Sequence, residues 1–217
     1  MIQFFQAGGF FMAPLLLTSL VSLAFILERG WALRRKNVAP ESVEQAIENC
    51  RTRKDLPILQ AACERAPSAL SRLALTAAAH LSWPKADNIN ALQTRARQEI
   101  IRLERGLVVL EIIVGVAPLL GLMGTIQGLM VLFADLGQAG AADTWALARG
   151  ISIALNTTLF GLAIAIPSLI AWSYYTKKVE NFSVELENLL DEFLRRLYRR
   201  ETGAGVRRKS KAAEARA

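Results

Sequence analysis

The chain has 217 residues, of which 53% are hydrophobic, and its formal net charge is +7. Three apolar runs separated by charged segments are typical of a membrane protein, in which excess Lys and Arg marks cytoplasmic segments rather than nucleic-acid binding. No catalytic array, phosphate-binding loop or zinc-finger spacing is visible, so the sequence favours neither an enzyme nor a metal, cofactor or nucleic-acid site. The single histidine, His80, has no companion ligands, and Cys50 and Cys63 are interpreted as inert thiols.

The first apolar run predicts a transmembrane helix over residues 10–30, after a short periplasmic N-terminus at 1–9. Trp31 and the basic residues at 34–36 follow it, as an interfacial aromatic and a cytoplasmic end would. A secretory signal peptide has the opposite polarity, with its basic residues first. The sequence therefore predicts a retained helix whose N-terminus lies outside.

Residues 31–87 predict a cytoplasmic segment of several short helices, because prolines interrupt it repeatedly. From residue 88 the apolar positions recur in steps of three and four and continue into the second crossing. We therefore predict one long helix over 88–133, partly in the cytoplasm. Glu111 lies just inside its membrane boundary, where an acid must face protein or water.

Small residues gather in the second crossing around one threonine. Gly121, Thr125 and Gly128 share a helix face, and Gly124 with Gly128 forms a pair that lets helices approach closely in lipid. Pro118 removes a backbone donor one turn earlier. Two interpretations stay open: a packing motif in which Thr125 bonds only its own i−4 carbonyl, or a face that presents its hydroxyl to another helix.

The third crossing is predicted over 149–176, after a periplasmic loop at 134–148. Thr158 and Gly161 lie in its outer half, with Pro167 in the inner half. Helix rise places Thr125 and Thr158 both about 12 Å below the outer surface. Two hydroxyls at one depth suggest either a polar ring in an assembly or an interhelical hydrogen bond worth about 0.6 kcal/mol.

Asn156 and Thr157 are additional polar groups in the third crossing. Asn156 lies almost opposite Thr158 round the helix, so we expect it to face a neighbouring helix. Beyond the crossing, an apolar stripe from Phe182 to Leu197 predicts a cytoplasmic helix over 177–201 that packs on the long helix. Residues 202–217 are expected to form a disordered basic tail, attracted to anionic lipid.

The chain resembles the MotA/TolQ/ExbB proton-channel family, and in particular its ExbB and TolQ branch. The resemblance rests on Ala117–Thr125 in the second crossing, on Gly150–Ile151, Thr158 and Gly161–Leu162 in the third, and on the order of all three crossings. Many relatives carry a glutamate where this chain has Ile153.

The resemblance implies an all-α membrane protein with three transmembrane helices and long cytoplasmic helical extensions, assembled as a homo-oligomeric ring, typically a pentamer. Such rings surround a dimer of an ExbD- or TolR-like partner, whose single crossing carries an aspartate, and sit in the bacterial inner membrane. By motif position, Thr125 and Thr158 would line the proton path. The implied function is a proton-driven motor that energises TonB-dependent or Tol-Pal-like transport, in the former case through a TonB-like protein. The alternatives are a flagellar or gliding stator and a non-conducting membrane scaffold.

Overall fold

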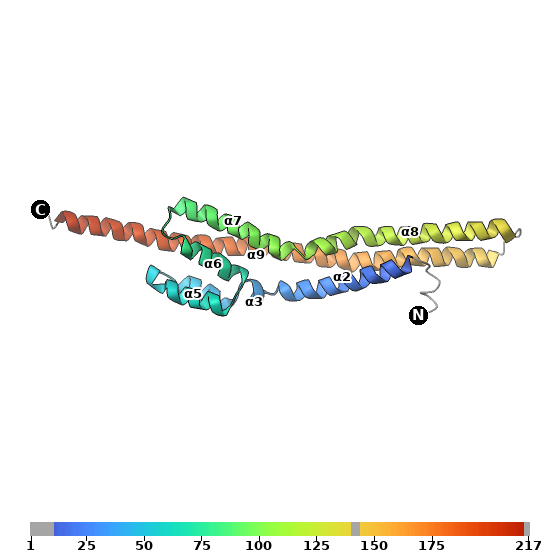
Figure 1. The fold of residues 1–217 in the computed structure, drawn as a ribbon, viewed down its shortest axis with the longest axis horizontal. Coiled ribbons are helices and arrows are strands. Elements are labelled where there is room, and N and C mark those ends of the chain that lie inside the picture. Colours follow the sequence, from blue (N-terminus) through green and yellow to red (C-terminus); the bar gives the residue numbers. More distant parts are fainter. Residues whose placement is uncertain (1–10, 140–143, 215–217) are drawn as a thin grey trace. The chain divides into compact units, whose positions relative to one another are not determined.

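The computed structural model describes residues 11–139 and 144–214. All the regular structure in these two ranges is helical, without a strand (Figure 1). Three of the described helices are long and apolar enough to cross a membrane. The prediction of an all-α protein with three candidate crossings is therefore confirmed; residues 1–9, predicted to be periplasmic, lie outside the described part of the chain.

The chain divides into two compact units. The first, here called the membrane unit, contains the described residues up to Trp31 together with Arg105–Thr176. The second, here called the extramembrane unit, contains Ala32–Glu104 and the chain from Lys177 onward.

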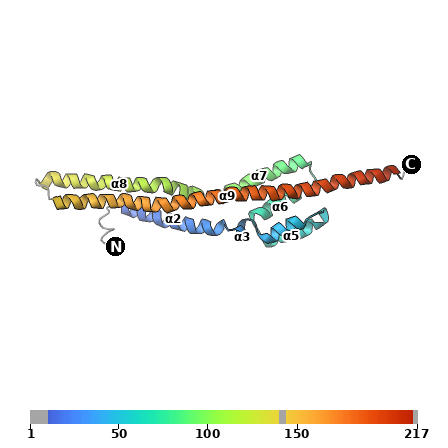
Figure 2. The same cartoon turned by 180° about the vertical axis from the view of Figure 1, so that it is seen from behind.

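The membrane unit consists of α2 (Met12–Ala32), α8 (Leu107–Ala139) and the first part of α9 (Thr144–Glu214). Both views show α8 and α2 running alongside this part of α9 (Figures 1 and 2). Most large apolar side chains of α2 and α8 that do not face another helix of the chain are exposed, for example Leu20 at 67% and Leu119 at 60%. This distribution is typical of helices surrounded by lipid or by further protein.

The extramembrane unit contains short helices before its longer ones. They are α3 (Arg35–Val38), α4 (Glu41–Asn49), a 3₁₀ turn (Arg53–Asp55), α5 (Leu56–Arg65), α6 (Ala69–Ala79) and α7 (Lys85–Glu104). Prolines lie at their starts: Pro40 is the N-cap residue of α4, and Pro57 lies in the first turn of α5. A proline costs little there because the first N–H groups of a helix have no intrahelical acceptor.

The core of the extramembrane unit is built between α9 and the short helices. Phe193 of α9 and Leu70 of α6 are fully buried, and Leu186 and Leu190 lie in the same cluster as Leu92 of α7. The apolar stripe of α9 therefore packs within the chain. Each such side chain contributes about 1.5–3 kcal/mol when it is removed from water.

The prediction of one long helix over 88–133 was wrong, because α7 ends at Glu104 and α8 begins at Leu107. The chain turns at Arg105 and Gly106. A Cβ at Gly106 would lie 2.4 Å from Nε of Arg29, so the Arg29 side chain occupies the space that another residue would need. Glycine also disfavours helix by about 1 kcal/mol relative to alanine. The periodicity of apolar residues alone contains no information on either effect.

Two further boundaries differ from the predicted ones. Helix α8 continues to Ala139 and α9 begins at Thr144, so much of the predicted loop over 134–148 is helical, and residues 140–143 lie outside the described ranges. Helix α9 also continues to Glu214, through most of the segment that was expected to be disordered. That segment is rich in Ala, Arg and Lys, which are strong helix formers.

Candidate functional site

Helices α8 and α9 are in close contact at several glycines. A Cβ built on Gly161 would lie 2.6 Å from the carbonyl oxygen of Ala117, and one on Gly121 would lie 3.0 Å from Cα of Thr158. Both glycines are buried. Neither position has room for a side chain, so the two backbones are in direct contact at this level.

Two more glycines of α8 continue the contact. Gly124 packs against the side chain of Thr157, which is 1% exposed, and Gly128 packs against Ala154. The small-residue face predicted in the second crossing is therefore the face that meets α9.

The side-chain hydroxyls of Thr125 and Thr158 hydrogen-bond each other across this contact. Thr125 Oγ1 also lies 3.0 Å from the carbonyl oxygen of Ala154. The carbonyl oxygen of Gly121 lies 3.3 Å from Thr125 Oγ1 and 3.2 Å from Thr158 Oγ1. Both threonines are half-buried, at the edge of the helix contact. The interpretation in which Thr125 bonds only its own i−4 carbonyl is therefore wrong.

This arrangement allows two orders of hydrogen-bond donation. In one, Thr158 donates to Thr125, which donates to the Ala154 carbonyl; in the other, Thr125 donates to Thr158, which donates to the Gly121 carbonyl. A hydroxyl is both donor and acceptor, whereas a carbonyl only accepts. The same heavy-atom positions thus serve both orders. In each order both hydroxyl protons are donated within the site, so an approaching group is offered a free lone pair, and it receives a proton only if a hydroxyl leaves its carbonyl acceptor.

The other predicted residues lie apart from this pair. Asn156 and Pro118 are half-buried, and Pro167 and Glu111 are exposed. The contact of Asn156 with a neighbouring helix stays a prediction.

A family model described as the MotA/TolQ/ExbB proton channel family matches residues 71–188, more than half of the chain. The chain belongs to the MotA/TolQ/ExbB proton channel family. The matched range contains the whole of α8 and the part of α9 that carries Thr158, and therefore the hydroxyl pair and its glycines.

The names of similar proteins support the ExbB- and TolQ-like branch of the family. It is 34% identical over 172 residues to a putative biopolymer transport protein, ExbB-like 1, of Synechocystis, covering 77% of this chain and 67% of the relative. It is 39% identical to the biopolymer transport protein ExbB of Helicobacter pylori, over 45% of this chain and 62% of the relative. The Tol-Pal system protein TolQ of Haemophilus influenzae is 33% identical, over 53% of this chain and 50% of TolQ.

A second hydroxyl pair in this family member was missed from the sequence. Ser22 of α2 and Ser168 of α9 hydrogen-bond at 2.6 Å, and both are nearly inaccessible to solvent. Tyr175 also donates to the carbonyl oxygen of Ile26, at 3.0 Å. The only signal was the presence of serines in two apolar runs, and each run contains more than one serine. These contacts hold α2 against α9, whereas the Thr125–Thr158 pair lies between α8 and α9.

A buried carboxylate in the extramembrane unit was also missed. Glu99 is 1% exposed and forms ion pairs with Arg72 at 2.6 Å, Arg102 at 3.1 Å and Arg95 at 3.2 Å. Burial alone raises the pKa of Glu99, but the hydrogen bond from Arg72 and the three positive charges outweigh it and hold the pKa below its ordinary value. Because Arg72 belongs to α6 and Glu99 to α7, this ion pair holds the two helices together.

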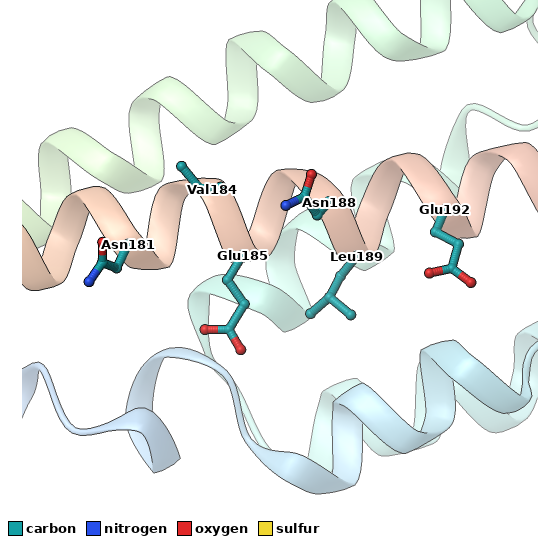
Figure 3. A pocket seen from close by; sticks show the side chains of 6 residues that line it. All are labelled: Asn181, Val184, Glu185, Asn188, Leu189 and Glu192. Carbon is teal, nitrogen blue, oxygen red and sulfur yellow. The ribbon is translucent and has the colours of Figure 1, made fainter.

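A shallow hollow of the extramembrane unit runs along α9. Figure 3 shows Val184 and Asn188 on one side of the helix and Glu185 and Leu189 on the other. Glu185 is already bound to Arg35 at 2.7 Å. Within the described residues no group of three or more His, Cys, Asp or Glu side chains could hold a metal ion. The hydroxyl pair of the membrane unit is therefore the better candidate site.

Proposed function

We propose that this chain is the ring subunit of a proton-motive-force-driven motor in the bacterial inner membrane. Its ring, a homopentamer by the family pattern, would surround the crossing helices of an ExbD- or TolR-like dimer. The observation that carries the proposal is the Thr125–Thr158 hydroxyl pair, held on two closely packed helices in the segment that the family model matches.

The chemistry of the crossings supports a partner that brings the acid. Residues 112–133 of α8 and 150–176 of α9 contain no Asp or Glu. A proton carrier at that depth must therefore come from another chain. A carboxyl group that alternates between charged and neutral forms in lipid needs polar neighbours in both forms. The threonine pair can accept from the neutral acid with a free lone pair, and it can donate to the carboxylate when one hydroxyl leaves its carbonyl acceptor.

The direction of insertion follows from charge. Basic residues follow the first crossing and precede the second, so the N-terminus would be periplasmic and the C-terminus cytoplasmic. Relatives named for biopolymer transport and for the Tol-Pal system support a role in energising transport across the periplasm, through a TonB-like protein in the first case. Each proton would supply about 2.3 kcal/mol per 100 mV of membrane potential.

Conduction distinguishes this proposal from a membrane scaffold. The complex of the full chain with its co-purified single-crossing partner is placed in liposomes that hold a pH-sensitive dye, and a potassium diffusion potential is imposed. The proposal predicts proton flux well above that of liposomes with this chain alone. Flux at the background level from an intact complex would contradict it and favour the scaffold.

A further inference from the structure

Glu111 and Thr125 lie on one stripe of α8. They are 14 residues apart, and Pro118 is midway between them. Seven residues make almost two helical turns, so the three positions drift by only about 20° per step. The helix continues through Pro118, and at about 1.5 Å per residue Glu111 lies roughly 21 Å from Thr125 along the axis. The stripe thus leads from the hydroxyl pair toward the predicted cytoplasmic end.

The Glu111 carboxylate is exposed, and it has no hydrogen bond or ion pair within the described residues. The nearby cation of α2, Arg29, is bound to Glu28 at 2.5 Å and covers Gly106. Gly106 is five residues from Glu111, which is about 140° round the helix. Glu111 is therefore neither neutralised nor covered by its own chain, although an ionised acid in a lipid environment is costly without water or protein around it.

The surface of α8 beyond Glu111 has room for water and polar groups that could bind the Glu111 carboxylate. A Cβ added to Gly115, one turn further on, would meet nothing within 4 Å. Pro118 has no N–H, so the carbonyl oxygen of Val114 lacks the usual helical donor. The Glu111 carboxylate, the bare Gly115 and the Val114 carbonyl, which lacks its usual helical donor, therefore lie within about one turn of α8.

We propose that Glu111 is the proton acceptor on the cytoplasmic side of the path, a role that rests on the proposed function. A carboxyl group of the partner releases its proton beside the Thr125–Thr158 pair and becomes a carboxylate. Water along the stripe carries the proton to Glu111, where a new O–H bond forms. That bond then breaks as the proton passes to cytoplasmic water, which restores the Glu111 carboxylate and leaves no net change in the chain.

The test compares Glu111→Gln, Glu111→Asp and Glu104→Gln in the liposome flux assay with the co-purified partner. Glu104 is the matched control, because it is an exposed glutamate at the end of α7, outside the crossing. We expect Glu111→Gln to lower the flux per assembled complex about tenfold. This is below the roughly 10²–10⁴ of a fully positioned acid–base group, since water carries part of the proton flow. Glu111→Asp, which keeps an ionisable group, and Glu104→Gln should conduct within about twofold of wild type.

The outcomes separate this inference from the proposed function. Wild-type flux in Glu111→Gln would overturn the role of Glu111 and leave the conducting ring intact. Equal losses in Glu111→Gln and Glu111→Asp would also overturn it, because they would indicate a requirement for side-chain shape rather than for proton uptake. Absence of flux in the wild-type complex would overturn the proposed function and this inference with it.

Discussion

The hydroxyls of Thr125 and Thr158 hydrogen-bond each other although the residues are 33 positions apart in the chain. Both hydroxyls also reach the carbonyl oxygen of Gly121, where α8 and α9 are in backbone contact. Side chains on two helices can share one carbonyl only when the backbones lie this close. The polar site therefore depends directly on the glycine packing.

Gly161→Ala should separate the helices. The new methyl group would lie 2.6 Å from the Ala117 carbonyl oxygen, which belongs to the backbone and cannot turn away. Overpacking of this kind costs about 1–3 kcal/mol. We expect a lower melting temperature of the full chain in detergent and a loss of proton flux, measured by thermal unfolding and in liposomes.

Gly115→Ala is the matched control for stability, because a Cβ there meets nothing within 4 Å. Replacing a helical glycine by alanine in open space should leave the chain as stable or stabilise it by up to about 1 kcal/mol. If Gly161→Ala and Gly115→Ala had the same melting temperature, the close approach at Gly161 would not be a feature of the folded protein.

Glu99→Gln should destabilise the extramembrane unit at neutral pH. The variant removes the negative charge that three arginines share, and we expect a loss of about 1–3 kcal/mol. This is at or below the roughly 3–5 kcal/mol of a broken buried pair, because the arginine side chains are partly exposed. Chemical denaturation of the full chain measures the difference, and Glu104→Gln, which changes an exposed acid, should lie within about 0.5 kcal/mol of wild type.

Wild type and Glu99→Gln also test the pKa of Glu99. Its folded pKa is below the ordinary value of 4.5, so its contribution is complete above that pH and is lost as the pH falls through the folded pKa. The stability gap between wild type and Glu99→Gln should therefore narrow in acid. A gap that stayed constant down to the acid transition would show that the carboxylate is not held ionised by its arginines.

The two cysteines should be unreactive in the folded protein. Cys50 is 1% exposed and Cys63 is 2% exposed, and both thiols are free. Burial raises the pKa of both thiols above the ordinary value of 9.0, which lowers the fraction of reactive thiolate. Iodoacetamide at mildly alkaline pH should label the native chain far more slowly than the denatured chain, as mass spectrometry would show. Rapid native labelling would contradict the burial of these side chains.

The sequence predicted the closeness of Thr125 and Thr158 better than it predicted the helix boundaries around them. Glycine spacing and helix rise are local properties, and they were enough to bring Thr125 and Thr158 to the same depth on antiparallel helices. The interruption at Gly106 was not predicted, and neither was the contact of Gly106 with Arg29, a residue on another helix. Periodicity records which side of a helix is apolar and contains no information on what occupies the space beside a glycine.

Long-range polar contacts were missed for the same reason. Ser22 and Ser168 are 146 residues apart, and Arg72 is 27 residues from Glu99. Each of these residues looks unremarkable in its own segment. Only the folded arrangement shows that Ser22, Ser168 and Glu99 are buried and that each has a partner. Burial without a partner would cost about 1–3 kcal/mol for each polar group.

The proton path is tested most directly by flux through complexes that carry Thr158→Val. Valine keeps the branched shape and removes the hydroxyl, and Thr18→Val is the matched control, since Thr18 donates only to its own helix, at Pro14. With assembly verified for each complex, we predict that Thr158→Val lowers the flux about tenfold or more, a modest share of what a positioned polar group contributes to proton transfer. Thr18→Val should conduct like wild type. Equal flux through both variants would contradict the claim that the Thr125–Thr158 pair lines the proton path.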